Sequence, residues 1–198
     1  FRLGAERRID RQGLCLAVRK ADFAPIQIIS KGVFESPGYS CEFSVMQWFL
    51  FTFLKPGYLF VSTVDNRTGE KIVIGNAHLA LEGDYCGRLA QAEELIRLAE
   101  DSVEDVDASC CFIGCDLNSA DDIAFDTMNE HMCNLTGDTG GAITWDCANP
   151  RTQSMLWDTK SHILSRQIDY IWCSQQKSQK SLKTVDVQII GNRKDQEL

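Results

Sequence analysis

The sequence has no excess of basic residues. Its 198 residues include 20 Lys and Arg against 28 Asp and Glu, which gives a formal net charge of −8 and a pI near 4.9. A protein that coats nucleic acid usually presents a basic face, so this composition argues against that class. It does not exclude an enzyme that acts on a phosphodiester, because a bound divalent cation can supply positive charge locally.

No apolar run is long enough to cross a membrane. The longest one, residues 43–54, is interrupted by Gln47 and ends at Lys55-Pro56-Gly57. A bilayer-spanning helix needs roughly 20 predominantly apolar residues. We therefore expect no transmembrane segment.

The nine cysteines contain no C-x-x-C pair, and their odd number leaves at least one thiol unpaired. The closest trio is Cys110, Cys111 and Cys115, in an apolar segment with no histidine beside it. Free cysteine in such a segment behaves as a small hydrophobic residue. A structural zinc site is therefore not expected, and the sequence predicts a reduced, cytoplasmic protein.

The hydrophobic pattern alternates between strands and helices along the chain. It predicts strands at residues 13–18, 43–54, 58–64, 71–77, 110–115, 168–173 and 185–190. Helical spacing of apolar residues predicts helices at residues 88–101 and 120–131, the first with Arg88 and Gln91 tying it to a neighbouring loop. We expect an α/β (α+β) fold, a two-layer β-sandwich flanked by helices, formed by residues 1–198 as a single domain.

Several of the predicted strands end in polar residues. In "CCFIGCDLN", Asp116 and Asn118 follow an apolar strand, and alternation would place them on one face. Two oxygen-bearing side chains there can hold a hard cation or orient a water. The alternative is that residues 118–121 only turn the chain and cap a helix.

Two other predicted strands carry polar side chains that could take part in catalysis. In "IVIGNAHL", Asn76 and His78 share a face, and the histidine could contact a phosphate or transfer a proton. It could equally be a structural histidine at the edge of a sheet. In "RQIDYI", Asp169 interrupts an apolar strand, which is costly unless a cation, metal, histidine or arginine compensates its charge. No G-x-S-x-G elbow, Walker loop or dinucleotide fingerprint is present.

Taken in order, these segments resemble one family. N-A-H-L after a strand, R-x-x-Q in a helix, G-C-D-L-N, T-W-D and R-Q-I-D-Y-I resemble the endonuclease/exonuclease/phosphatase superfamily, which has the deoxyribonuclease I-like fold. The resemblance covers about residues 13–190. The segment T-W-D-x-x-N-P, residues 144–150, is similar to bacterial metal-dependent hydrolases and to neutral sphingomyelinases.

The resemblance implies a role for each polar strand end. Asp116 and Asn118 match the pair that orients the attacking water and contacts the phosphate or the metal. His78 matches the histidine that contacts the scissile phosphate, with Asn76 beside it, and Asp169 matches the aspartate that supports the catalytic histidine. The implied cofactor is Mg²⁺ or Mn²⁺, and the implied activity is that of a phosphoric ester hydrolase.

Two parts of the family pattern are not found in the sequence. The family has a Q-E segment with a metal-binding glutamate before the "GLCLAV" region, and an S-D-H segment with the catalytic histidine near its end. Because both absences fall at the termini, we expect a domain that is incomplete at both ends. The implied substrate is a nucleic acid, a phospholipid headgroup or a small phosphate ester, and no obligate protein partner is evident. The alternative function is a non-catalytic binding or scaffold module that keeps the fold.

Overall fold

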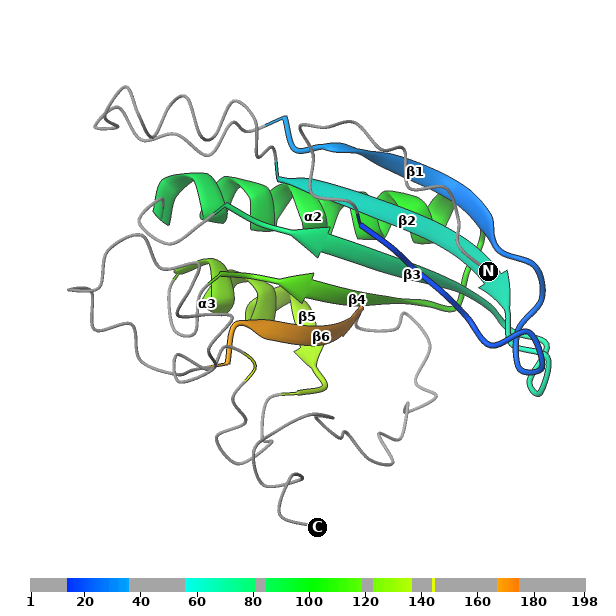
Figure 1. The fold of residues 1–198 in the computed structure, drawn as a ribbon. Helices are drawn as coiled ribbons and strands as arrows, with labels where there is room; N and C mark the ends of the chain where they lie inside the picture. Colours follow the sequence, from blue (N-terminus) through cyan, green and yellow to red (C-terminus); the bar gives the residue numbers. More distant parts are fainter. Residues whose placement is uncertain are drawn as a thin grey trace, which may run out of the picture.

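A computed structural model of the chain describes residues 14–35, 56–80, 85–118, 123–136, 144 and 167–174. These residues form an α/β fold with a mixed six-stranded sheet, whose strand order is β1-β2-β3-β4-β6-β5 (Figure 1). The strands are β1 (Gln27–Val33), β2 (Gly57–Val64), β3 (Lys71–His78), β4 (Cys110–Asp116), β5 (Met132–Asn134) and β6 (Asp169–Ser174). The helices are α2 (Tyr85–Asp105) and α3 (Ile123–His131).

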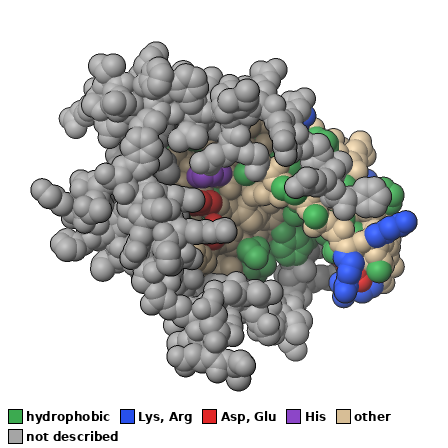
Figure 2. Space-filling model, viewed as in Figure 1, with side chains coloured by type: hydrophobic (Ala, Val, Ile, Leu, Met, Phe, Trp, Pro, Cys, Tyr) green, Lys and Arg blue, Asp and Glu red, His purple; other side chains and the backbone are tan. Residues whose placement is uncertain are grey.

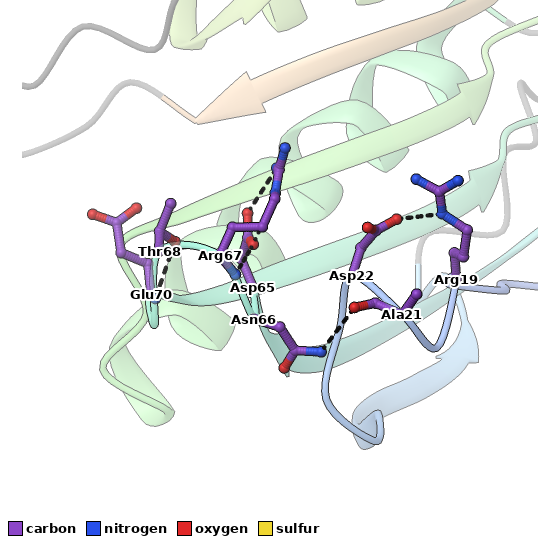
Figure 3. Close-up of polar contacts among 8 residues, drawn as sticks. All are labelled: Arg19, Ala21, Asp22, Asp65, Asn66, Arg67, Thr68 and Glu70. Carbon is purple, nitrogen blue, oxygen red and sulfur yellow. Dashed lines mark hydrogen bonds and ion pairs between the residues drawn. The ribbon is translucent and has the colours of Figure 1, made fainter.

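The β2–β3 hairpin closes one end of the sheet. Its turn is fixed by the Asp65 carboxylate, which accepts hydrogen bonds from the backbone and the guanidinium of Arg67 (Figure 3). Gly69 follows with φ 74°, in the left-handed region that glycine occupies at no steric cost. The Asn66 side chain donates to the carbonyl of Ala21, which joins the hairpin to the preceding turn. Because Val64 pairs with Lys71 here, the hairpin lies at the end of β3 opposite to His78.

β3 and β4 pair in parallel, whereas all the other neighbouring strands pair antiparallel. A parallel pair needs a crossover connection, and α2 supplies it. Figure 1 shows α2 and α3 on the same face of the sheet. The main core lies between the helices and this face, and it includes buried Leu95, Ile113 and Trp172.

The opposite face of the sheet carries a smaller apolar cluster. Leu16 packs there with Leu59 and Val61 of β2, and the Asn76 side chain donates to the carbonyl of Cys15. The apolar alternation that predicted a strand at residues 13–18 thus reflects real burial. The strand assignment itself is wrong for residues 14–18, because this segment rests on the face of the sheet and forms no ladder with the described strands.

Most of the other predicted elements fall within the described residues. β2, β3, β4, β6 and both helices are confirmed within a few residues of their predicted bounds, and β1 and β5 were not predicted. The predicted strands at residues 43–54 and 185–190 lie outside the described residues. The described strands all belong to one sheet, so the second layer of the predicted sandwich is not among them. None of the described helices is long and apolar enough to cross a membrane.

Candidate functional site

Three polar side chains form a row across three neighbouring strands. His78 at the end of β3 is the register partner of Asp116 in β4, and Asp116 is in turn the register partner of Asp169 in β6. The His78 Nε2 atom lies 3.8 Å from Asp116 Oδ2. All three lie on the sheet face opposite to the helices, and Figure 2 shows a histidine and acidic side chains side by side in a hollow of this face.

A cleft runs from this row along the face of the sheet. It has a volume of about 350 Å³, and its lining includes the row of three as well as Leu14, Asn76, Gly114 and Ile171. A second row of register partners lies two residues further from the strand ends and consists of Asn76, Gly114 and Ile171. Gly114 contributes to the open space, because a Cβ atom built there would meet no described atom within 4 Å. The sequence reading gave no role to this glycine.

Asn118 reaches the site by a turn and not by strand alternation. β4 ends at Asp116, and Asn118 has φ 54°, so the extended geometry that would repeat side chains on one face stops before it. The Asn118 N–H donates to Asp116 Oδ1 at 3.0 Å, and its side-chain amide donates to the carbonyl of Leu79 at 2.9 Å. The expectation of simple alternation was therefore wrong, although Asn118 does lie next to Asp116.

The surroundings of the Asp116 carboxylate disfavour its ionised form. Burial raises its pKa, and the negative charge of Asp169 raises it further. Attraction to His78 and the hydrogen bond from the Asn118 N–H act in the opposite direction, but the net shift of the Asp116 pKa is upward. Two carboxylates that face each other at a partly buried strand end hold negative charge that a cation could neutralise.

The two carboxylates of the row are oxygen ligands of the kind that a hard divalent cation binds. Among the described residues, no three His, Cys, Asp or Glu side chains are grouped to hold a metal ion. Asp116 and Asp169 nevertheless offer carboxylate oxygens from directly opposed positions. The amide nitrogen of Asn118 is bound to the carbonyl of Leu79, so the amide oxygen is the atom of this side chain that could bind a cation. Carboxylate and amide oxygens are ligands suited to Mg²⁺ or Mn²⁺.

The segment that follows β3 is anchored to α2. The N–H of Ala80 donates to Gln91 Oε1 at 2.8 Å, and both Gln91 and Arg88 are buried. Arg88 and Gln91 were predicted to tie this helix to a neighbouring loop, and the hydrogen bond of Gln91 confirms this for Gln91. Leu79 also donates its N–H to the carbonyl of Asp116, so this anchored segment holds the end of β4.

Thr144 is a described residue whose position near the site the sequence did not indicate. Its hydroxyl oxygen accepts hydrogen bonds from the N–H groups of Ile168 and Asp169. In the sequence it stands out only as the first residue of the T-W-D-x-x-N-P segment. A contact between residues so far apart in the chain cannot be read from local pattern.

Solved structures of other proteins share this fold. An endonuclease/exonuclease/phosphatase family protein from Bacteroides thetaiotaomicron is 16% identical with a TM-score of 0.51, and the match covers 79% of this chain and 51% of that one. An endonuclease/exonuclease/phosphatase from Bacteroides vulgatus is 19% identical with a TM-score of 0.50, covering 79% and 56%. TDP2 from D. rerio, solved in complex with a single-strand DNA product, is 15% identical with a TM-score of 0.50, covering 81% and 56%.

These likenesses show that the chain has the α/β fold of endonuclease/exonuclease/phosphatase proteins, as the sequence resemblance predicted. The chain spans about half the length of these solved structures, between 51% and 56%. No protein-family model matches the sequence, and no curated protein matches it either.

Proposed function

We propose that the protein is a metal-dependent phosphoric ester hydrolase whose active site includes the row of His78, Asp116 and Asp169. The observation that carries the proposal is the register that brings these three side chains together at the ends of three strands. The fold supports it, since solved proteins with this fold include members described as endonuclease/exonuclease/phosphatase proteins. Residues far apart in the sequence supply a histidine and two carboxylates to one cleft, and Asn118 donates its backbone N–H to one of these carboxylates.

Each side chain has a role that its position supports. His78 lies beside the carboxylate of Asp116 and lines the cleft, where it can donate a hydrogen bond to a phosphate oxygen. The Asn118 side chain, fixed by Leu79, can orient a water molecule for in-line attack. Asn76 is the weakest member of the predicted set, because its amide nitrogen is already bound to the Cys15 carbonyl.

Asp116, Asp169 and the amide oxygen of Asn118 would hold the divalent cation, Mg²⁺ or Mn²⁺. When bound, the cation supplies positive charge that neutralises the phosphate and the leaving oxygen. The carboxylates serve this purpose only when ionised, and the raised pKa of Asp116 places a proton in competition with the cation.

The proposal is tested with the full-length protein and Mg²⁺ on panels of phosphodiesters, phosphomonoesters and phospholipids. For the best substrate, Asp116→Ala should lower kcat by about 10²-fold or more, as for the loss of one preorganised stabilising group. His78→Ala should act on the same step. Asp126→Ala is the matched control, because Asp126 is an exposed carboxylate on α3 and should leave kcat unchanged.

Two results would overturn the proposal. One is the absence of hydrolysis across all panels in the presence of Mg²⁺ or Mn²⁺, together with binding of a phosphate ester. That result would instead favour the non-catalytic binding module. The other is a wild-type kcat in Asp116→Ala, because a group that holds the cation cannot be removed without slowing the chemical step.

A further inference from the structure

The outer edge of β6, near its start, carries backbone groups that none of the described strands pairs. β6 is bordered by β4 on one side, whereas on the other side β5 pairs only with Trp172, Cys173 and Ser174. In an antiparallel ladder, successive residues direct their N–H groups alternately to the two sides. The Leu117 N–H donates to the carbonyl of Ile168 on the β4 side, so the N–H of the next residue, Asp169, faces the other side.

Two threonine hydroxyl groups continue this edge beyond the end of β5. The Ile171 N–H donates to Thr136 Oγ1 at 3.3 Å. One step nearer to the site, the Asp169 N–H donates to Thr144 Oγ1 at 3.1 Å, and the Ile168 N–H donates to the same oxygen at 2.9 Å. Each hydroxyl oxygen thus accepts hydrogen bonds in the place where a backbone carbonyl of a neighbouring strand would accept them, and so satisfies amide groups at this edge.

The strand end at Asp169 needs such an anchor. Asp169 and Asp116 stand directly opposite each other, and like charges at directly opposed positions destabilise the pairing of two strands. This repulsion acts on the first residue of β6, where a strand frays most readily. The Gln167 side chain also contacts the backbone here, by donating to the carbonyl of Asp169 at 3.2 Å, but both residues are more exposed than their buried neighbour Ile168.

We propose that Thr144 is a positioning residue that fixes the Asp169 carboxylate in the site through its hydrogen bonds to the start of β6. The inference rests on the proposed function for its effect on catalysis, and on the backbone contacts alone for its effect on β6. Thr144 comes from a segment remote from β6 in the sequence, so it couples the position of that segment to the geometry of the site.

The test compares Thr144→Val, Thr144→Ser and Thr136→Val in the full-length protein. Valine keeps the shape of threonine and removes the acceptor, whereas serine keeps the acceptor. Thr144→Val should lower kcat by roughly 10- to 100-fold while KM changes by less than about twofold, because misplacement of a catalytic group by about 1 Å can cost 10²-fold. Thr144→Ser should stay near the wild-type kcat. Thr136→Val, the matched control on the same edge, should lower Tm without a comparable loss of kcat.

Amide hydrogen exchange provides a readout that does not depend on activity. Thr144→Val should speed the exchange of the Ile168 and Asp169 amides, and Thr144→Ser should restore their protection. The inference is wrong if exchange at these two amides is unchanged in Thr144→Val, or if Thr144→Ser is as damaging to kcat as Thr144→Val. If the wild-type protein has no hydrolase activity, the proposed function fails, and the exchange rates still decide whether Thr144 holds Asp169.

Discussion

Asn118 combines an uncommon backbone conformation with a side chain for which we propose a role in hydrolysis. Its φ of 54° lies in the left-handed region, which costs most L-residues about 1–2 kcal/mol and which Asn tolerates better than most. The backbone requirement and the chemical requirement therefore select the same residue type. A substitution must separate the two before the side chain can be given a role in hydrolysis.

If Asn118 has the proposed role, Asn118→Gly and Asn118→Ala should lose kcat equally, by about 10²-fold, because both lack the amide proposed to orient water. Their stabilities should differ, since glycine accepts the left-handed conformation and alanine does not. Chemical denaturation should find the alanine variant less stable than the glycine variant by about 1 kcal/mol. Wild-type kcat in Asn118→Gly would mean that Asn is present only for its backbone conformation.

The charge of Asp116 should make the protein less stable as pH rises. Its folded-state pKa lies above the usual value of 3.8, mainly because of burial and then because of Asp169, so the folded state binds the proton more tightly than the unfolded state. Stability from this group is fully present below pH 3.8 and is lost as pH rises through the raised pKa. Asp116→Asn, which cannot ionise, should therefore have a higher Tm than wild type at neutral pH.

The gain in Tm should shrink toward zero in acid, where wild-type Asp116 is protonated in both states. Thermal melts of the two proteins across the acid range measure it, with the exposed Asp126→Asn as the control. A Tm difference that is independent of pH would show that the substitution acts through packing and not through charge.

At the residue scale, the sequence indicates which strand ends are polar but not how they are held. His78, Asp116 and Asp169 each interrupt or close an apolar strand, so their presence near a common edge could be predicted. The turn at Asn118 was the alternative interpretation of residues 118–121, since Asn favours turns. The sequence could not show that this turn keeps Asn118 bonded to Asp116 and Leu79. The contact of Thr144 depends on where β5 ends, which only the assembled sheet determines.

The pairing of β4 with β6 brings two like charges together. Its register places Asp116 opposite Asp169, and a slip of one residue would relieve this repulsion. A slip would also move every β6 side chain to the other face of the sheet. Tyr170 and Trp172 prevent it, because they are buried on the helix face and their rings contact that of Phe125 in α3.

Two glycines in the central strands should respond in opposite ways to alanine. A Cβ atom at Gly75 would lie 2.7 Å from a ring carbon of Phe60, which is fully buried, whereas a Cβ at Gly114 meets no described atom within 4 Å. We expect Gly75→Ala to lower the free energy of unfolding by about 1–3 kcal/mol. Gly114→Ala should change it by less than about 0.5 kcal/mol.

Urea denaturation of both variants measures the difference. Equal stabilities would contradict the close packing of Phe60 against β3. Gly114→Ala also reports on the cleft, because its added methyl group enters the space beside Asn76 and Ile171.

The two strands that the sequence did not predict, β1 and β5, form through pairing with adjacent strands and show little pattern of their own. β1 is an edge strand with a register irregularity near Ile28, and its side chains are largely exposed, so it has no clear apolar alternation. β5 follows α3 without an intervening loop and has only three residues. The segment at residues 14–18 shows the reverse case, in which an alternating pattern reflects burial against a sheet face without strand pairing.

At the scale of the whole molecule, the described cysteines divide into exposed and buried thiols. None of the six described cysteines forms a disulfide with another described cysteine. The buried ones are poor nucleophiles, because burial raises the pKa of the Cys111 and Cys115 thiols, and the pKa of Cys173 is raised by its hydrogen bond with Cys110 as well as by burial. Brief treatment of the native protein with iodoacetamide at about pH 8 should therefore modify Cys15 and Cys133 before the four buried cysteines described.

Peptide mass spectrometry after quenching identifies the modified thiols, and a denatured sample provides the control in which all are accessible. Early modification of Cys115 would contradict its burial beneath the site. Disulfides joining any of the six described cysteines in the isolated protein would contradict the reduced state.

The position of β6 in the sheet has a consequence for how the protein is made. β6 lies between β4 and β5, although it follows both of them in the sequence. On the ribosome, a nascent chain can assemble β1 to β4 and both helices while the strand that separates β4 from β5 has not yet emerged. Until then the backbone N–H and C=O groups on the edge of β4 that β6 will cover are open to pairing with other chains. The emergence of β6 therefore covers this edge of β4 in the same step that brings Asp169 to Asp116.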